Sequence, residues 1–195
     1  RLPYYLAAIE AIDTEMGRLF NSISSEDLDN TIVIFIGDNG TPGPVAQQYH
    51  SQRAKGSLYK GGINVPMVIS GKGVERMNDQ EDALISTVDL FATISELCGI
   101  YHAQQIHDSN SFFNLLTITG SSRSHLYSEK GNNYFTVRNS THKYMSFQDG
   151  SEALFNLQTN PFEMPNLLSP NQLPLSENDQ ENLSDLINIA GQIRN

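Results

Sequence analysis

Basic side chains are scarce in this sequence. Its 195 residues include 12 Lys and Arg against 22 Asp and Glu, which gives a formal net charge of −10. Without a basic cluster, the chain lacks the phosphate-tracking surface that non-specific nucleic-acid binding requires. We therefore expect no nucleic-acid partner, and an anionic substrate would need cations placed locally.

Long apolar runs and cysteines are also lacking. The longest uninterrupted apolar stretches, 4–9 and 32–36, are far short of the ~20 residues needed to cross a bilayer, so no membrane span is expected. The single cysteine, Cys98, permits neither an internal disulfide nor a zinc–cysteine cluster, and therefore indicates no redox compartment. Because Cys98 lies on the apolar face of a predicted helix, we interpret it as a small core residue.

The sequence opens with Arg1 and Leu2, without an initiator methionine or a secretory signal. We therefore expect a piece of a longer protein or a processed chain. Its length suffices for one domain, or for one domain with a small appendage.

The first half of the chain alternates helical and strand patterns. Apolar residues three and four positions apart predict an amphipathic helix over 5–23. The β-branched run 31–36 predicts a strand of a parallel sheet that is covered on both faces. A second strand is predicted over 65–70 and a helix over 88–98. This order predicts an α/β layer.

The second half has a different character, because short strand patterns are separated there by Gly, Asn and Ser. The strand candidates are 126–129, 134–138, 143–147 and 153–156, and apolar spacing over 183–193 predicts a last helix. We expect an antiparallel subdomain, with one domain over 1–104 and the second over 105–195.

Asp38 and Asn39 are candidate metal ligands, because they directly follow a predicted buried strand. Ligands of open α/β sheets collect at the carboxyl ends of strands. A carboxylate and an amide carbonyl are hard oxygen ligands, which suit calcium or magnesium better than zinc or copper. The sequence Asp-Asn-Gly is also common in tight turns, so a turn with a purely structural role is an alternative interpretation.

Lys55 and His50 lie in the loop between the two predicted strands, and both are candidates for anion binding. Glycines in this loop let the backbone approach a ligand closely. A loop lysine is more often a solvated charge. His50 could donate a hydrogen bond to an anion, although a surface or structurally bonded histidine is the commoner case.

Five separated segments agree, in order, with motifs of one protein family. They are the opening helix with Tyr5, Ile9, Ile12, Asp13 and Gly17; the strand and turn 30–40; the loop 55–66; the helix 88–94; and the segment 153–167. Together they resemble the sulfatases of the alkaline-phosphatase superfamily. The resemblance implies the later half of an alkaline-phosphatase-like α/β sandwich, followed by a small antiparallel α+β C-terminal subdomain.

The resemblance also implies a function and a site. It implies a sulfuric ester hydrolase acting on a sulfated small molecule or glycan, with secretion or a periplasmic location expected. It makes Asp38 and Asn39 ligands of Ca²⁺, or of Mg²⁺, and makes Lys55 a catalytic residue that contacts the sulfate. His50 is a further candidate for binding substrate.

Three departures from the family pattern stand out. Gly37 stands where Ser or Thr is common. Lys60 replaces the glutamate usually found before the double glycine. The Cys-x-Pro-x-Arg or Ser-x-Pro-x-Arg motif, whose first residue the family matures to formylglycine, does not occur. The resemblance therefore implies that a missing N-terminal part of the same protein is a partner of this chain, which alone is inactive.

Two other functions compete with a sulfatase. A phosphatase, phosphodiesterase or phosphonate hydrolase of the same superfamily makes similar demands on a site. Its zinc-dependent members usually carry histidine after the aspartate, so Asn39 argues for a harder ion. A non-catalytic binding module would explain the missing nucleophile, but it has no need of Asp38, Asn39 and Lys55 together.

Overall fold

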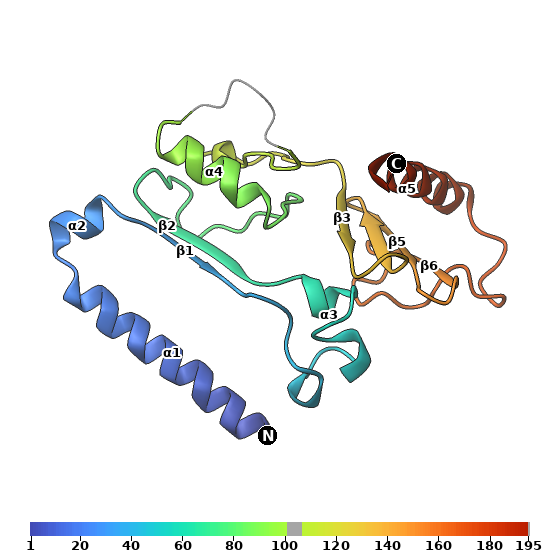
Figure 1. Ribbon diagram of the computed structural model, residues 1–195, viewed down its shortest axis with the longest axis horizontal. Coiled ribbons are helices and arrows are strands. Elements are labelled where there is room, and N and C mark those ends of the chain that lie inside the picture. Colours follow the sequence, from blue (N-terminus) through green and yellow to red (C-terminus); the bar gives the residue numbers. More distant parts are fainter. Residues whose placement is uncertain (101–106, 195) are drawn as a thin grey trace. The chain divides into compact units, whose positions relative to one another are not determined.

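The computed structural model describes residues 1–100 and 107–194 and falls into two units, Arg1–Met77 and Asn78–Asn195 (Figure 1). The domain boundary expected between residues 104 and 105 lies outside the described residues, and it stays a prediction. Each unit is described separately below.

The first unit begins with the predicted amphipathic helix, α1 (Leu2–Ser22). Pro3 stands in its first turn, where a missing backbone N–H costs nothing. The apolar side chains of Ile9, Ile12 and Leu19 are 48%, 49% and 56% exposed, and no residue of α1 is buried within the described part of the chain. The short helix α2 (Ser25–Asp29) follows, with Ser24 as its N-cap.

The two predicted strands form β1 (Ile32–Ile36) and β2 (Met67–Gly71), but their pairing differs from the prediction. β1 pairs with β2 antiparallel, from Ile36 opposite Met67 to Ile32 opposite Gly71. The expected parallel neighbour is therefore wrong for this pair. A continuous apolar run indicates burial on both faces and carries no information on strand direction.

The expected cover on both faces of β1 is not found within the described residues either, because Phe35 is 40% exposed. Three short turns lie between the strands: η1 (Gly43–Val45), η2 (Ser51–Arg53) and α3 (Lys60–Ile63).

The second unit begins around the predicted helix α4 (Asp89–Leu97), which is followed by the turn η3 (Phe113–Leu116). Asp89 is fully buried and accepts hydrogen bonds from the backbone N–H of Asn110 at 2.9 Å and from Arg123 Nε at 2.8 Å. This side-chain hydrogen bond raises the pKa of Arg123. Cys98 is exposed, so the prediction of a core residue was wrong. The helix ends at Leu97, and Cys98 is its C-cap.

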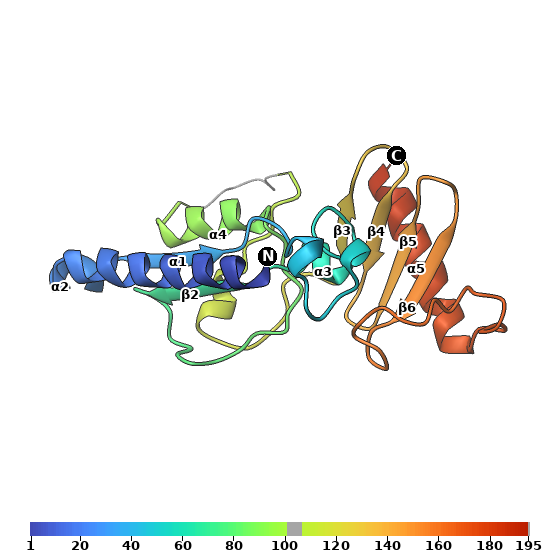
Figure 2. The same cartoon turned by 90° about the horizontal axis from the view of Figure 1, so that it is seen from below.

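All four short strands of the second half are confirmed. β3 (Leu126–Glu129), β4 (Phe135–Arg138), β5 (His142–Ser146) and β6 (Glu152–Asn156) form one antiparallel sheet in sequence order. The predicted last helix is α5 (Glu177–Arg194), and Figure 2 shows it lying along one face of the sheet. The core between helix and sheet consists of Val137, Tyr144, Leu154, Leu186 and Ala190.

A polar contact joins this sheet to the first turn of α5. His142 Nε2 lies 2.8 Å from Asp179 Oδ1, and Ser176 accepts the backbone N–H of Asp179. Desolvation alone would raise the pKa of Asp179, but hydrogen bonds from Ser176, His142 and Asn156 outweigh it and lower that pKa. The ionised carboxylate therefore suits its place at the helix N-terminus.

A buried ion pair holds the loop after β6 to the sheet. Lys143 Nζ lies 2.5 Å from Glu163 Oε1, and the two side chains are only 2% and 1% exposed. Burying two charges costs several kcal/mol per ion, which their mutual attraction and hydrogen bonding must offset. Removal of only one of the two charged side chains should therefore lower the free energy of unfolding markedly.

We predict that Lys143→Met or Glu163→Leu alone lowers the free energy of unfolding by about 3–5 kcal/mol, because each disrupts a buried charge pair. The double variant Lys143→Met/Glu163→Leu should lose less than either single variant. Urea unfolding of the three variants measures this, and additive losses would contradict the prediction.

Candidate functional site

The turn after β1 carries the candidate metal ligands Asp38 and Asn39. Backbone hydrogen bonds secure both ends of this turn: Gly37 N–H donates to Pro66 at 3.0 Å, and Gly40 N–H donates to Gly62 at 3.0 Å. The two polar residues are thus fixed against the segment that leads into β2.

Glycine is required where the turn meets this segment. A Cβ on Gly40 would lie 1.9 Å from the carbonyl oxygen of Gly61, and one on Gly62 would lie 2.1 Å from that of Ser57. Real Cβ atoms do not approach backbone this closely, so the two stretches pack backbone against backbone. The sequence displays these glycines but does not show that they meet.

The loop that carries Lys55 is bound to the same turn. Lys55 N–H donates to the carbonyl of Thr41 at 3.0 Å, and the neighbouring Ala54 and Leu58 are buried while the Lys55 side chain is exposed. The structure therefore brings the backbone of Lys55 to the turn of Asp38 and Asn39, although 16 positions separate Lys55 from Asn39 in the sequence.

The side chains of Asp38 and Asn39 suit a hard cation. Asn39 Nδ2 donates to Asp38 Oδ1, which places the amide and the carboxylate side by side. Their oxygens are of the type that calcium and magnesium prefer. No group of three or more His, Cys, Asp or Glu that could hold a metal ion occurs within residues 1–100 and 107–194. The assignment of these two residues as ligands stays a prediction.

His50 has a structural role in the loop. It is the N-cap of η2, and its Nδ1 accepts the backbone N–H of Gln52 at 3.3 Å. When the ring is neutral, its proton is therefore on Nε2, which makes this nitrogen a donor. Such a donor is compatible with the predicted contact to substrate, which stays a prediction.

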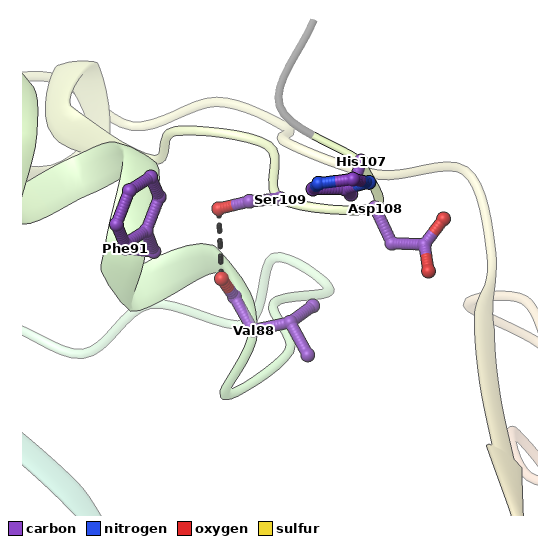
Figure 3. Close-up of a pocket in the computed structure, with 5 residues that line it drawn as sticks. All are labelled: Val88, Phe91, His107, Asp108 and Ser109. Atoms are coloured by element: carbon purple, nitrogen blue, oxygen red, sulfur yellow. Dashed lines mark hydrogen bonds between the residues drawn. The ribbon is translucent and has the colours of Figure 1, made fainter.

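A separate hollow lies at the start of α4 and includes none of the predicted site residues. Val88, Phe91, His107, Asp108 and Ser109 line it (Figure 3). Ser109 Oγ donates to the carbonyl of Val88 at 2.7 Å and accepts the backbone N–H of Ala92 at 3.0 Å. These bonds hold the segment after residue 106 to the helix, which is a structural role.

Comparisons with known proteins identify the family of these motifs. The family model described as Sulfatase matches residues 1–100, about half of the chain. Arylsulfatase K of Gallus gallus is 28% identical over 184 residues, which cover 84% of this chain and 33% of the relative. The chain thus spans about a third of the length of such curated relatives.

Solved structures confirm the predicted fold class. The structure of BT4656 in complex with its substrate D-glucosamine-2-N,6-O-disulfate superposes with a TM-score of 0.77 at 20% identity, covering 96% of this chain and 40% of that one. BT1596, described as a 2-O GAG sulfatase, gives a TM-score of 0.68 at 22% identity, with coverages of 85% and 36%. At this identity the likeness concerns the fold.

We predict that Gly40→Ala separates the turn from the Gly61 backbone and lowers the free energy of unfolding by about 1–3 kcal/mol, as overpacking commonly does. Thermal unfolding measures the change.

Gly17→Ala is the matched control, because a Cβ at Gly17 meets nothing within 4 Å. In the interior of an exposed helix this change should stabilise by up to ~1 kcal/mol. Equal melting temperatures for the two variants would show that the contact at Gly40 is unimportant.

Proposed function

The chain belongs to the sulfatase family, and on that premise we propose that it is the C-terminal part of an enzyme that hydrolyses a sulfate ester. The observation that carries the proposal is the convergence of Asp38, Asn39 and Lys55 at one end of the β1–β2 ladder, through backbone contacts of Gly40 and Thr41. A local turn and a solvated loop lysine would not need to be joined in this way.

Lys55 is proposed to bind the sulfate group. Its exposed ammonium extends from a loop whose backbone is fixed to the turn of Asp38 and Asn39. In this place it stabilises negative charge on the sulfate oxygens and on the leaving oxygen as the ester bond breaks. One such donor is typically worth ~3 kcal/mol, about a hundredfold in rate.

Asp38 and Asn39 are proposed to hold a divalent cation, Ca²⁺ or Mg²⁺. Their carboxylate and amide oxygens supply part of a six- to eight-fold oxygen shell, and residues outside this chain complete it. When bound, the cation withdraws charge from the sulfate oxygens. We propose that the nucleophile is a formylglycine supplied by a segment upstream of this chain, as the family resemblance implies.

The missing N-terminal part is proposed to cover the apolar stripe of α1. The side chains of Ile9, Ile12 and Leu19 are about half exposed although their spacing is that of a helix facing a core. Apolar faces of this length are normally buried against another element.

A sulfated small molecule or glycan is the proposed substrate, and a sulfated glucosamine is the substrate named for the solved relative BT4656. Asn39 favours sulfate ester hydrolysis over zinc-dependent phosphate ester hydrolysis, because an amide does not replace a soft imidazole ligand.

None of the described helices is long and apolar enough to span a membrane. A secreted or periplasmic location is proposed from the family.

We predict that Lys55→Ala in the complete enzyme lowers kcat for an aryl sulfate by about a hundredfold, because one charge-stabilising donor is lost. Stability should change by less than about 0.5 kcal/mol, as is usual for exposed loop positions. Steady-state kinetics and thermal unfolding measure the two effects.

Lys72→Ala is the control for charge, since Lys72 lies beyond the opposite end of the β1–β2 ladder and contacts Asn30. Its kcat should stay within about twofold of the unaltered enzyme. Small and equal losses in both variants would identify Lys55 as ordinary surface charge.

We predict that Asp38→Ala weakens Ca²⁺ binding by the complete enzyme at least about tenfold, because a hard carboxylate ligand is removed. Titration calorimetry measures the affinity, and Asp13→Ala on the exposed face of α1 is the control. Unchanged Ca²⁺ affinity in Asp38→Ala would remove Asp38 from the metal site.

A further inference from the structure

The turn after β1 contains a chemically reactive pair, Asn39 and Gly40, which is the only Asn-Gly sequence in the chain. Asparagine is a thermolabile residue, because the backbone nitrogen of the following residue can attack its side-chain carbonyl carbon. A following glycine favours this attack, since it has no side chain to shield its nitrogen and its backbone turns freely. A candidate metal ligand therefore stands at a site of spontaneous modification.

The modification, deamidation, needs only water. Gly40 N bonds to Asn39 Cγ, the Cγ–Nδ2 bond breaks, and the departing nitrogen takes the proton of Gly40 N and leaves as ammonia. Water then opens the cyclic imide, giving its hydroxyl to a carbonyl carbon and its proton to the nitrogen. Opening at Cγ yields aspartate, whereas opening at the main-chain carbonyl yields isoaspartate, whose main chain runs through the former side chain.

Two hydrogen bonds restrain the reacting groups. Gly40 N–H, which carries the attacking nitrogen, donates to the carbonyl of Gly62 at 3.0 Å. Asn39 Nδ2, the leaving nitrogen, donates to Asp38 Oδ1. A nitrogen whose proton is held by a carbonyl is a poor nucleophile, and an amide that is held at its nitrogen does not turn its carbonyl carbon freely. Both bonds must break before the reaction begins.

Packing protects the bond to Gly62. A Cβ on Gly62 would lie 2.1 Å from the carbonyl oxygen of Ser57 and 2.8 Å from that of Ala54, and Ala54 is only 1% exposed. The segment that accepts the hydrogen bond of Gly40 therefore does not shift without disturbing a buried loop. Release of Gly40 N–H requires local opening of this packing, and such opened states are a small fraction of a folded population.

We propose that Asn39 is a latent deamidation site, and that the backbone contact between Gly40 and Gly62 sets the rate of its conversion to aspartate or isoaspartate. Only the opened turn reacts, so the rate follows the population of the opened state. Isoaspartate lengthens the main chain between Asp38 and Gly40. It thereby moves the ligand out of the proposed cation site, and activity falls with the converted fraction; this consequence alone rests on the proposed function.

The test incubates the complete enzyme at mildly alkaline pH, folded and in urea, and follows residue 39 by peptide mapping with mass spectrometry. We expect conversion to be at least about tenfold slower in the folded enzyme than in the unfolded chain. Asn39→Gln keeps the amide but requires a larger ring, so it should show no conversion. Equal rates in the folded and unfolded enzyme, or no conversion in the unfolded chain, would overturn the inference.

Gly62→Ala tests the contact itself, because the Asn-Gly sequence stays intact while the new Cβ displaces the segment that binds Gly40 N–H. Conversion should become about fivefold faster. Gly17→Ala is the matched control, since its Cβ meets nothing within 4 Å, and its rate should not change. Equal rates in these two variants would contradict a role for the contact. Circular dichroism checks folding, and if Gly62→Ala does not fold, the comparison of folded with unfolded unaltered enzyme decides.

Failure of the proposed function has a different signature. An enzyme that turns over no sulfate ester still converts Asn39 at the expected rates, because the mass change does not depend on activity. Full activity of the isoaspartate form would instead remove Asn39 from the proposed cation site.

Discussion

The contact between the backbones of Gly40 and Gly61 is the constraint on which the site depends. No side chain fits on Gly40 at this contact, since a Cβ there would lie 1.9 Å from the Gly61 oxygen. The turn with Asp38 and Asn39 therefore cannot move independently of the loop with Lys55. The side chain of Lys55 takes no part in this positioning, which depends on its backbone N–H.

Local patterns in the sequence predicted most elements of the fold. Helix α1 and strands β3 to β6 were found because their periodicity or boundaries are local properties of the chain. The direction of β1 against β2 was predicted wrongly, since it depends on partner residues 31 to 39 positions away. The exposure of Cys98 was also missed, because the helical spacing continues one residue beyond the last turn of α4.

The candidate site was predictable only in part. Asp38, Asn39 and Lys55 were selected by position and by family resemblance, because their residue types alone favoured a structural turn and a solvated charge. The hydrogen bonds that join them connect segments about 20 positions apart, so no window of sequence shows them. Helices α1 and α5 illustrate the same point: both are amphipathic, and Leu186 of α5 is fully buried against its sheet, whereas no residue of α1 is buried among the residues that the structure describes.

The buried pair of Lys143 and Glu163 has a consequence for how this protein can change over generations. Loss of either charge alone removes the opposite charge that lies 2.5 Å from the other inside the subdomain, so a lineage that replaces one residue passes through a less stable intermediate. The two positions should consequently be inherited together or exchanged together. In an alignment of relatives they would covary, even though 19 residues separate them in the chain.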